Sequence, residues 1–402
     1  MKVAVYYPWV YLPGGPERIL VELTARSRHE WAIFTNHYDA AHSFPQLRRR
    51  AVVELPRVPV QRSLVKVAYA GLRILLQRLP TQGFDALVVM CEGLGDLVVF
   101  RNGELPTLCL CLTPLRPAYD SHYRECALRS RGWLSRNLLQ ASLSVFRLAD
   151  RLAWRRFDHV VCISHEVRRR ALEGGLDRAR TAQVAHPGPG LQGGADVSFD
   201  RFFLLPGRIM WTKNLELGIE AFQWLRRAHP ELADFRLVLA GIVDQKSEPY
   251  AERLRALAGA DPSIEFRIHP GDAELAELYR TCRAVLFTAF NEDWGIVPLE
   301  AMAFGKAVVA TNRGGPRESI LPGVQGFLEE PQAEAFGRRM AQLAGDPGLA
   351  ASMGRAGRER ARDFTWEAFT ACVDGSVERA VAVRRLEPVG VTEPNRQGSA
   401  LT

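Results

Sequence analysis

Residues 284–320 constrain the fold more than any other stretch of this sequence. They open with an apolar run, Ala284–Phe290, which has the length of a buried strand. A polar segment and a turn at Gly295 follow, and then a helix-like run, Pro298–Phe304. The next apolar run, Ala307–Ala310, has the pattern of another buried strand. This order predicts a βαβ unit with a right-handed crossover, and therefore the α/β fold class.

The loop inside this unit carries the residues that are candidates for binding and catalysis. Gly295, Ile296 and Val297 lead into the helix, where free N–H groups and the helix dipole favour an anion such as a diphosphate. Glu292 precedes this turn and Glu300 lies inside the helix. Two carboxylates beside an anion would repel it if both faced the phosphates. They fit the site if each accepts hydrogen bonds from hydroxyl groups instead. We expect a sugar on one side of the diphosphate and a ribose on the other.

The spacing of Glu292 and Glu300 within GIVPLEAMAFGKAVVA resembles the retaining nucleotide-sugar glycosyltransferases of family GT4, also called group 1. Two unrelated surface carboxylates would give the same bare spacing, so the surrounding residues carry the resemblance. It implies that Glu292 contacts the transferred sugar and that Glu300 binds the ribose. It also implies the GT-B fold, in which two Rossmann-like, doubly wound domains face an interdomain cleft.

Two further segments match this family. Gly14 and Gly15 in GGPER resemble its GGxER loop, which faces the donor phosphates and the acceptor; a lone Gly-Gly pair would otherwise indicate a simple turn. Arg208 and Lys213 resemble the pair of cations that clasps the donor diphosphate, and two exposed cations are the alternative. Two cations in one loop can neutralise a leaving phosphate.

The segment TPLRPAYDSHYRE resembles the HTPLRYxxD segment of mannosyltransferase-like members. It places Arg116, Tyr119 and Asp120 on the acceptor or sugar side, and it favours GDP-mannose as the donor over a UDP-sugar. Leu112 stands where the family usually has a histidine. The backbone carbonyl is kept there but the imidazole is lost, so a catalytic histidine is not expected.

Composition limits the possible partners and cofactors. The chain has 402 residues, 47% of them hydrophobic and 24% charged, as in an ordinary globular protein. Its net charge of +7 fits an anionic donor, an anionic membrane or nucleic acid. Nucleic acid is the weakest of these because no basic arm or zinc finger is present. No C-x-x-C or Asp-x-Asp pattern occurs, so we expect no metal site, no cofactor and metal-independent chemistry.

The sequence also suggests where the protein works. No apolar run is long enough for a spanning helix, and the seven scattered cysteines fit buried thiols in a reducing cytoplasm. Residues 124–157 are expected to be helical and are rich in arginine. They form either a solvated helix face or a surface for an anionic membrane or a lipid-linked acceptor. We therefore expect a cytoplasmic protein, with possible peripheral contact with the inner face of the membrane.

The alternation of strands and helices predicts two domains. Residues 1–190 form the expected N-terminal, acceptor-side Rossmann-like domain, and residues 200–363 form the expected nucleotide-sugar-binding domain. A last helix, at about residues 364–385, should pack back on the first domain. The polar tail, residues 387–402, is expected to be disordered.

The resemblance implies transfer of a sugar from a nucleotide diphosphate sugar to an acceptor hydroxyl with retention of configuration. Glu292, Arg208 and Lys213 would be its catalytic residues, and the two cations would stabilise the leaving diphosphate. The acceptor could be a glycan, a lipid-linked sugar or a small molecule. A function of another class also stays open: a sugar-nucleotide binding protein without catalysis, or an epimerase of the same fold.

Overall fold

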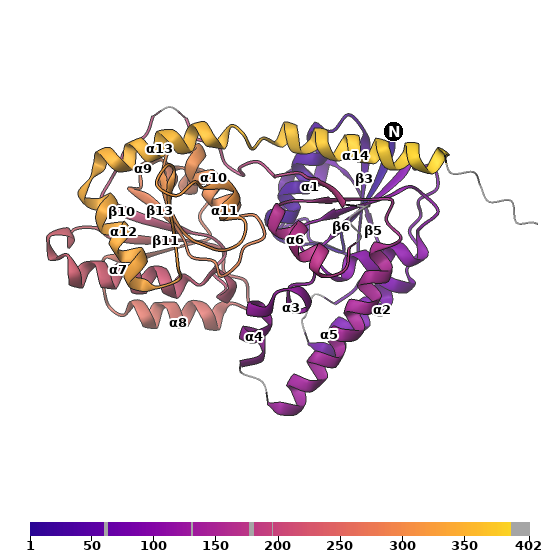
Figure 1. Ribbon diagram of the computed structural model, residues 1–402, viewed down its shortest axis with the longest axis horizontal. Coiled ribbons are helices and arrows are strands. Elements are labelled where there is room, and N and C mark those ends of the chain that lie inside the picture. Colours follow the sequence, from indigo (N-terminus) through magenta and orange to yellow (C-terminus); the bar gives the residue numbers. More distant parts are fainter. Residues whose placement is uncertain (60–62, 130–131, 177–180, 195, 387–402) are drawn as a thin grey trace, which may run out of the picture.

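The computed structural model describes residues 1–59, 63–129, 132–176, 181–194 and 196–386. Two parallel β-sheets lie side by side, each covered by helices (Figure 1). Their inner strands are short apolar runs that are almost completely buried, as in a parallel sheet covered on both faces, whereas the edge strands are partly exposed. The predicted α/β class is confirmed. The predicted tail, residues 387–402, lies outside the described residues.

The N-terminal sheet has seven strands in the order β5-β3-β1-β6-β7-β8-β9. Its strands are β1 (Lys2–Tyr6), β3 (Glu30–Thr35), β5 (Ala51–Glu54), β6 (Ala86–Cys91), β7 (Thr107–Cys111), β8 (His159–Cys162) and β9 (Thr181–Val184). The helices of this half are α1 (Gly15–Arg26), α2 (Leu64–Leu76), the 3-10 helix η2 (Leu94–Arg101), α3 (Arg116–Tyr119), α4 (Ser121–Arg129), α5 (Trp133–Trp154) and α6 (His165–Glu173).

The C-terminal sheet has six strands in the order β12-β11-β10-β13-β14-β15. Its strands are β10 (Phe202–Pro206), β11 (Arg236–Gly241), β12 (Ile264–Ile268), β13 (Ala284–Phe287), β14 (Ala307–Thr311) and β15 (Gly326–Glu329). The helices are α7 (Leu215–Ala228), α8 (Glu248–Ala258), α9 (Asp272–Thr281), α10 (Ile296–Ala303), α11 (Pro316–Ser319), α12 (Ala333–Gly345), α13 (Pro347–Ala361) and α14 (Trp366–Leu386).

Both sheets reverse their strand order at one point, between β1 and β6 in the first and between β10 and β13 in the second. In open parallel sheets, ligands bind beside the carboxyl ends of the strands at such a switch point. The glycine loop follows β1, the Arg208–Lys213 loop follows β10, and the loop with Glu292 follows β13. The topology therefore brings the loops that carry the sequence motifs to the switch points.

The last helix, α14, lies against α1 and the strands β6, β7 and β8 of the N-terminal sheet (Figure 1). The Trp366 indole N–H at its start donates a hydrogen bond to the Pro189 carbonyl at 2.8 Å. We propose residues 1–190 and 200–363 as the two domains, because each range contains one complete sheet.

The arginine-rich segment 124–157 differs from the single helical stretch that its sequence suggests. The structure forms two helices, α4 and α5, and α5 begins after Gly132, whose extended backbone caps it. The N-terminal half of α5 projects away from the N-terminal sheet, at the tip of a hairpin with α4 (Figure 1).

Candidate active site

The loop between β13 and α10, residues 288–295, contacts the Lys213 loop, the turn before α11 and the N-terminal half. The Thr288 hydroxyl donates to the Lys213 carbonyl at 2.8 Å, and the Phe290 N–H donates to the Thr212 carbonyl at 3.2 Å. On its other side, the Gly315 N–H donates to the Glu292 carbonyl at 2.9 Å. These hydrogen bonds fix residues 288–295 between the Arg208–Lys213 loop and the turn before α11.

Glycine at position 314 permits the closest of these approaches. Gly314 has a φ of 68°, and a Cβ atom there would lie 2.2 Å from the Glu292 carbonyl oxygen. A Cβ at Gly315 would lie 2.2 Å from the Trp294 carbonyl oxygen. Any side chain at either position would therefore push the Glu292 loop away from its place.

The N-terminal half holds the same loop through a buried ion pair. Arg170 on α6 is 1% exposed and donates to the Asp293 carboxylate, to the Asn291 carbonyl at 3.2 Å, and to Glu166 at 2.8 Å. The Thr113 hydroxyl donates to Asp293 at 2.9 Å. These contacts join the TPLR segment and α6 to the loop of the opposite domain.

Glu292 lies among three cations. Its carboxylate forms an ion pair with the Lys213 ammonium group, and Arg116 and Arg208 act on it through space. Burial by itself would raise the pKa of Glu292, but the three positive charges outweigh it and hold the pKa below its usual range. The structure thus brings together the three residues that the sequence singled out as catalytic, with Glu292 ionised.

The N-terminus of α10 opens toward the glycine loop of the other domain. Gly295 precedes the helix with a φ of 93°, and no described side chain caps it, so Ile296 and Val297 keep their N–H groups at an open helix start. A Cβ at Gly15 would lie 3.9 Å from the Ile296 side chain. Gly14 immediately precedes α1. The predicted glycine loop and the predicted anion-binding turn therefore face each other.

A small pocket lies between the two domains, beside the glycine loop. Leu12 and Pro13 line it from the glycine loop, and Arg208 lines it from the loop after β10. Its remaining lining residues are Ile209, Met210, Ile242, Asp244 and Ser247. Arg208 thus lies at the interdomain cleft, where a diphosphate between the domains would meet it.

Glu300 occupies a different environment from Glu292. Tyr279, which is fully buried, donates its hydroxyl hydrogen to the Glu300 carboxylate at 2.7 Å. A Cβ at Gly190 would lie 2.6 Å from the other carboxylate oxygen, so the linker between the domains runs close beside it. Burial raises the pKa of Glu300 to about 7. Near neutral pH this carboxyl group is therefore divided between its protonated and ionised forms.

Of the three residues predicted on the acceptor or sugar side, Arg116 and Asp120 lie at the site and Tyr119 does not. Arg116 is held by Asp120 at 3.2 Å and by the Asn291 carbonyl, so both predicted residues reach the Glu292 loop. Burial acts to raise the pKa of Asp120, but the Tyr123 N–H and Arg116 outweigh it and lower the pKa overall. The structure does not bring Tyr119 to this place, because its ring stacks on Trp154 at 5.7 Å, inside the N-terminal half.

One buried residue at the site, Glu17, was not predicted. Glu17 at the start of α1 is 4% exposed, and burial raises its pKa to about 7, although Arg208 acts to lower it. Its carboxylate lies so close to Gly14 that a Cβ there would be 2.8 Å from it. Leu112, the residue in place of the family histidine, is buried at the end of β7.

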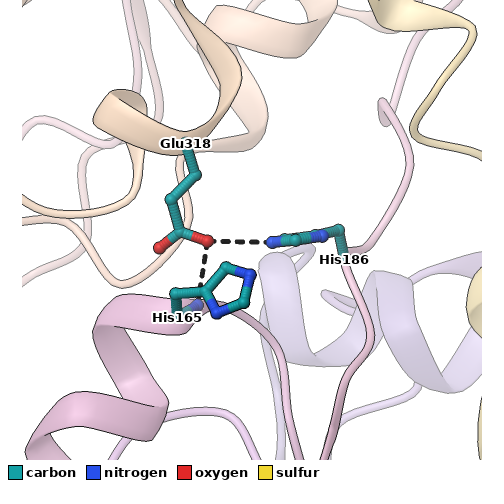
Figure 2. Close-up of side chains that lie close together, drawn as sticks. All are labelled: His165, His186 and Glu318. Atoms are coloured by element: carbon teal, nitrogen blue, oxygen red, sulfur yellow. Dashed lines mark hydrogen bonds and ion pairs between the residues drawn. The ribbon is translucent and has the colours of Figure 1, made fainter.

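A second contact between the domains involves His165, His186 and Glu318 (Figure 2). The Glu318 carboxylate accepts hydrogen bonds from the backbone N–H groups of His165 and Glu166 and from His186 Nε2, all at 2.8 Å. These three side chains are of types that bind metal ions. Both carboxylate oxygens already accept hydrogen bonds from protein groups, so the cluster functions structurally as a cap on α6 from the opposite domain.

Comparison with known proteins shows which family the C-terminal half resembles. Residues 197–360 match the family described as Glycosyl transferases group 1. The alpha-1,3/1,6-mannosyltransferase ALG2 of Mus musculus is 29% identical over 395 residues, 89% of this chain and 91% of that protein. The family match thus lies in the C-terminal half, and the alignment with the mouse protein extends the similarity over most of the chain. The human ALG2 is 37% identical over 180 residues, which span 42% of this chain and 43% of the human protein.

The D-inositol 3-phosphate glycosyltransferase of Kribbella flavida is 36% identical over 168 residues, 40% of this chain and 39% of that enzyme. HepE of Anabaena in complex with UDP and glucose has a TM-score of 0.70 at 18% identity, covering 94% of this chain and 100% of its own. Sucrose-phosphate synthase of Thermosynechococcus elongatus has a TM-score of 0.70 at 19% identity, covering 96% and 100%. These structural likenesses confirm the GT-B fold of this chain.

The described helices of this protein include none whose length and apolar character would let it cross a membrane.

Gly314→Ala is expected to lower turnover about a hundredfold by displacing the Glu292 loop, as a shift of about 1 Å at a reacting group can do. Gly323→Ala is the matched control, because Gly323 also has a positive φ, 80°, but no atom lies within 4 Å of its added Cβ. Steady-state kinetics and thermal unfolding should be measured on both variants. Equal turnover in the two variants would show that the close approach at Gly314 does not position Glu292.

Glu300→Gln is expected to remove part of the pH dependence of stability. The carboxyl group has a pKa of about 7 in the folded protein and an ordinary value of 4.5, so the folded state holds a proton that the unfolded state releases. The free energy of unfolding of the wild type should therefore fall between pH 4.5 and 7, relative to the variant, by about 1–3 kcal/mol.

Chemical denaturation across this pH range measures the difference between Glu300→Gln and the wild type. Glu220→Gln, at an exposed position on α7, serves as the control and should follow the wild type. Parallel pH profiles for Glu300→Gln and the wild type would contradict the assignment of a raised pKa to Glu300.

Proposed function

We propose that this protein is a group 1 glycosyltransferase that moves a sugar, with GDP-mannose favoured as the donor, to an acceptor hydroxyl with retention of configuration. The observation that carries the proposal is the position of the ionised Glu292 carboxylate beside Lys213 and Arg208, at the open N-terminus of α10. Cations, helix N-terminus and carboxylate together fit a diphosphate with a sugar attached to it.

In the proposed reaction, the bond between the sugar C1 atom and the donor phosphate oxygen breaks, and its electron pair leaves with the diphosphate. Arg208, Lys213 and the N–H groups of Ile296 and Val297 stabilise the negative charge that develops there. The acceptor oxygen forms its bond to C1 on the same face, and its proton passes to the departing phosphate oxygen. Glu292 holds the sugar hydroxyls during this exchange, and Glu300 holds the ribose.

Two resemblances support a mannosyl donor. The TPLR segment resembles mannosyltransferase-like members, and the ALG2 relatives are by their name alpha-1,3/1,6-mannosyltransferases. We therefore propose a mannosyl donor, with a lipid-linked or cell-surface glycan as the acceptor and a peripheral position at the cytoplasmic side of a membrane. A UDP-sugar donor is the rival, and a non-catalytic sugar-nucleotide binding protein is the rival of another class.

A panel of GDP-, UDP-, ADP- and TDP-sugars tests the donor, with thermal shift as the binding measurement and nucleotide release as the turnover measurement. GDP-mannose should give the largest shift and should release GDP when an acceptor is present. A larger shift with a UDP-sugar would move the donor assignment to the rival. Binding without any release, for all donors and acceptors, would favour the non-catalytic protein.

Metal independence gives a separate prediction. We expect turnover to continue in EDTA, because the two cations Arg208 and Lys213 occupy the place where a divalent ion would neutralise the diphosphate. His186→Ala tests the cluster with Glu318, which is the metal-ligating group found among the described residues. Loss of turnover in EDTA with recovery on addition of Mn²⁺ would contradict metal independence, and abolition of that recovery by His186→Ala would assign the ion to this cluster.

Glu292 and Glu300 should differ in what they bind. Glu300→Ala is expected to weaken free GDP by roughly 1.5–3 kcal/mol, because GDP carries the ribose. Glu292→Ala should leave the affinity for free GDP nearly unchanged and should lower kcat with the intact donor. Lys213→Ala should lower both the affinity for free GDP and kcat, with a loss of about 2–4 kcal/mol in transition-state stabilisation.

Calorimetry with free GDP on the two glutamate variants gives the decisive contrast. The pH dependence adds a second reading: free GDP should bind more tightly to the wild type as pH rises through about 7, because ionised Glu300 accepts hydrogen bonds from the ribose. Equal losses of GDP affinity for both variants would mean that the loop faces the opposite way.

A further inference from the structure

Exposed apolar side chains are concentrated on two helices of the N-terminal half. Ten of the fourteen exposed large hydrophobic residues in the described part of the chain lie on α2 and α5. On α2 they are Val65, Tyr69, Leu72 and Leu76, and on α5 they are Trp133, Leu134, Leu138, Val145, Leu148 and Leu152. Apolar patches of this kind mark interaction surfaces on soluble domains.

The spacing shows that each set forms a continuous stripe. The α2 residues follow one another at intervals of four, three and four positions, which keeps them on one side of a helix. On α5, the exposed stripe is opposite the side that buries Leu139, Leu143 and Ala153. Both helices pack on the same 3-10 helix, η2, so the two stripes belong to one region of the surface, at the lower right in Figure 1. We call these ten residues the α2–α5 face.

The exposed charges on α2 and α5 are of one sign. The two helices contain five cationic residues, Lys66, Arg73, Arg136, Arg147 and Arg151. Asp150 is their single acidic residue, and it is buried. An apolar stripe with flanking cations, an exposed tryptophan and no exposed acid is the composition of a helix that lies in a membrane interface.

Several arginines of this region are already used within the protein. Arg147 donates to the Ala118 carbonyl at 3.0 Å, and Arg151 donates to the Gly174 carbonyl at 2.9 Å. Arg124 also donates to the Ala118 carbonyl, at 3.1 Å. Their hydrogen bonds hold α4 and α5 to the rest of the N-terminal half. The apolar stripe, rather than the arginine charge, is therefore the main feature that this surface offers to a partner.

We propose that the α2–α5 face inserts into one leaflet of a lipid membrane. A second copy of this chain is the main rival occupant. In a two-fold contact the same patch would meet itself, so the cations of the two helices would approach like charges across the contact. A lipid leaflet instead provides hydrocarbon for the stripe and phosphate groups for the flanking cations.

The position of this face relative to the candidate active site fits the insertion. Helix α4 connects α5 to the cleft, where the Tyr123 ring lies 4.9 Å from Trp211 and the His122 ring lies 4.8 Å from Phe290. A lipid anchored in the leaflet could therefore present its head group along α4 to the cleft. This last step rests on the proposed sugar transfer, and the insertion names the surface that would serve the peripheral membrane position proposed above.

Co-sedimentation with two kinds of vesicle tests the insertion, one of phosphatidylcholine alone and one of phosphatidylcholine mixed with phosphatidylglycerol. The protein should bind both, and binding to the neutral vesicles should persist at high salt, because burial of apolar side chains is not screened. Tryptophan emission should shift to the blue on binding, and Trp133→Phe should reduce that shift.

Leu72→Glu and Leu138→Glu should each lower the partition constant at least about tenfold, since burial of one leucine side chain exceeds the 1.4 kcal/mol equivalent to a factor of ten. Val383→Glu on α14 is the matched control, because Val383 is 51% exposed and Leu72 is 54% exposed, but Val383 lies outside the face. Free GDP affinity, measured on every variant, reports whether the donor site is intact independently of membrane binding.

Three results would overturn the proposal. One is binding that requires phosphatidylglycerol and disappears at high salt, which would indicate attraction by charge alone. Another is a concentration-dependent dimer in light scattering that Leu138→Glu dissociates, which would assign the face to a second copy. The third is equal vesicle binding by Leu138→Glu and Val383→Glu.

Discussion

The buried ion pair between Arg170 and Asp293 is the interaction on which the rest of the site depends. Arg170 belongs to α6 of the N-terminal half, and Asp293 follows Glu292 directly in the loop of the C-terminal half. Breaking such a pair leaves an uncompensated buried charge, which costs about 3–5 kcal/mol. The ion pair, the Thr113 hydroxyl and the Glu318 carboxylate thus act together to hold the two domains around one loop. Catalysis by positioned charges requires this kind of fixed arrangement.

The two glutamates of the loop and helix show how one segment can serve two parts of a ligand. Glu292 stays ionised because Lys213, Arg116 and Arg208 surround it, and a diphosphate that binds near these cations would compete with it for them. Glu300 is buried against Tyr279 and has a pKa of about 7, so it is ready to ionise when a ligand offers hydroxyl groups. The cations lie beside the loop that precedes α10, and the titrating carboxyl group of Glu300 lies further along the same helix.

Much of the fold and of the donor side follows from the sequence, since local residue patterns specify these features. The Ala284–Phe290 run, the turn at Gly295 and the start of α10 lie within one short stretch, and topology then places Arg208 and Lys213 beside them. The partners that come from distant segments were not predictable. Nothing in the run Arg168–Arg170 indicates that only the last of its arginines is buried against another domain, and Tyr119 belongs to a recognisable motif although its ring packs elsewhere.

A double-mutant cycle between Arg170 and Glu292 tests the central claim, that the contact between the domains positions Glu292 for turnover. Arg170→Met, Glu292→Ala and the double variant should be compared by kcat with GDP-mannose, and free GDP affinity should be measured on each as the control for folding. We predict that Arg170→Met lowers kcat in the wild-type background but has little further effect once Glu292 is replaced, with a coupling energy of about 1–3 kcal/mol. Additive losses, with GDP affinity retained, would contradict the account.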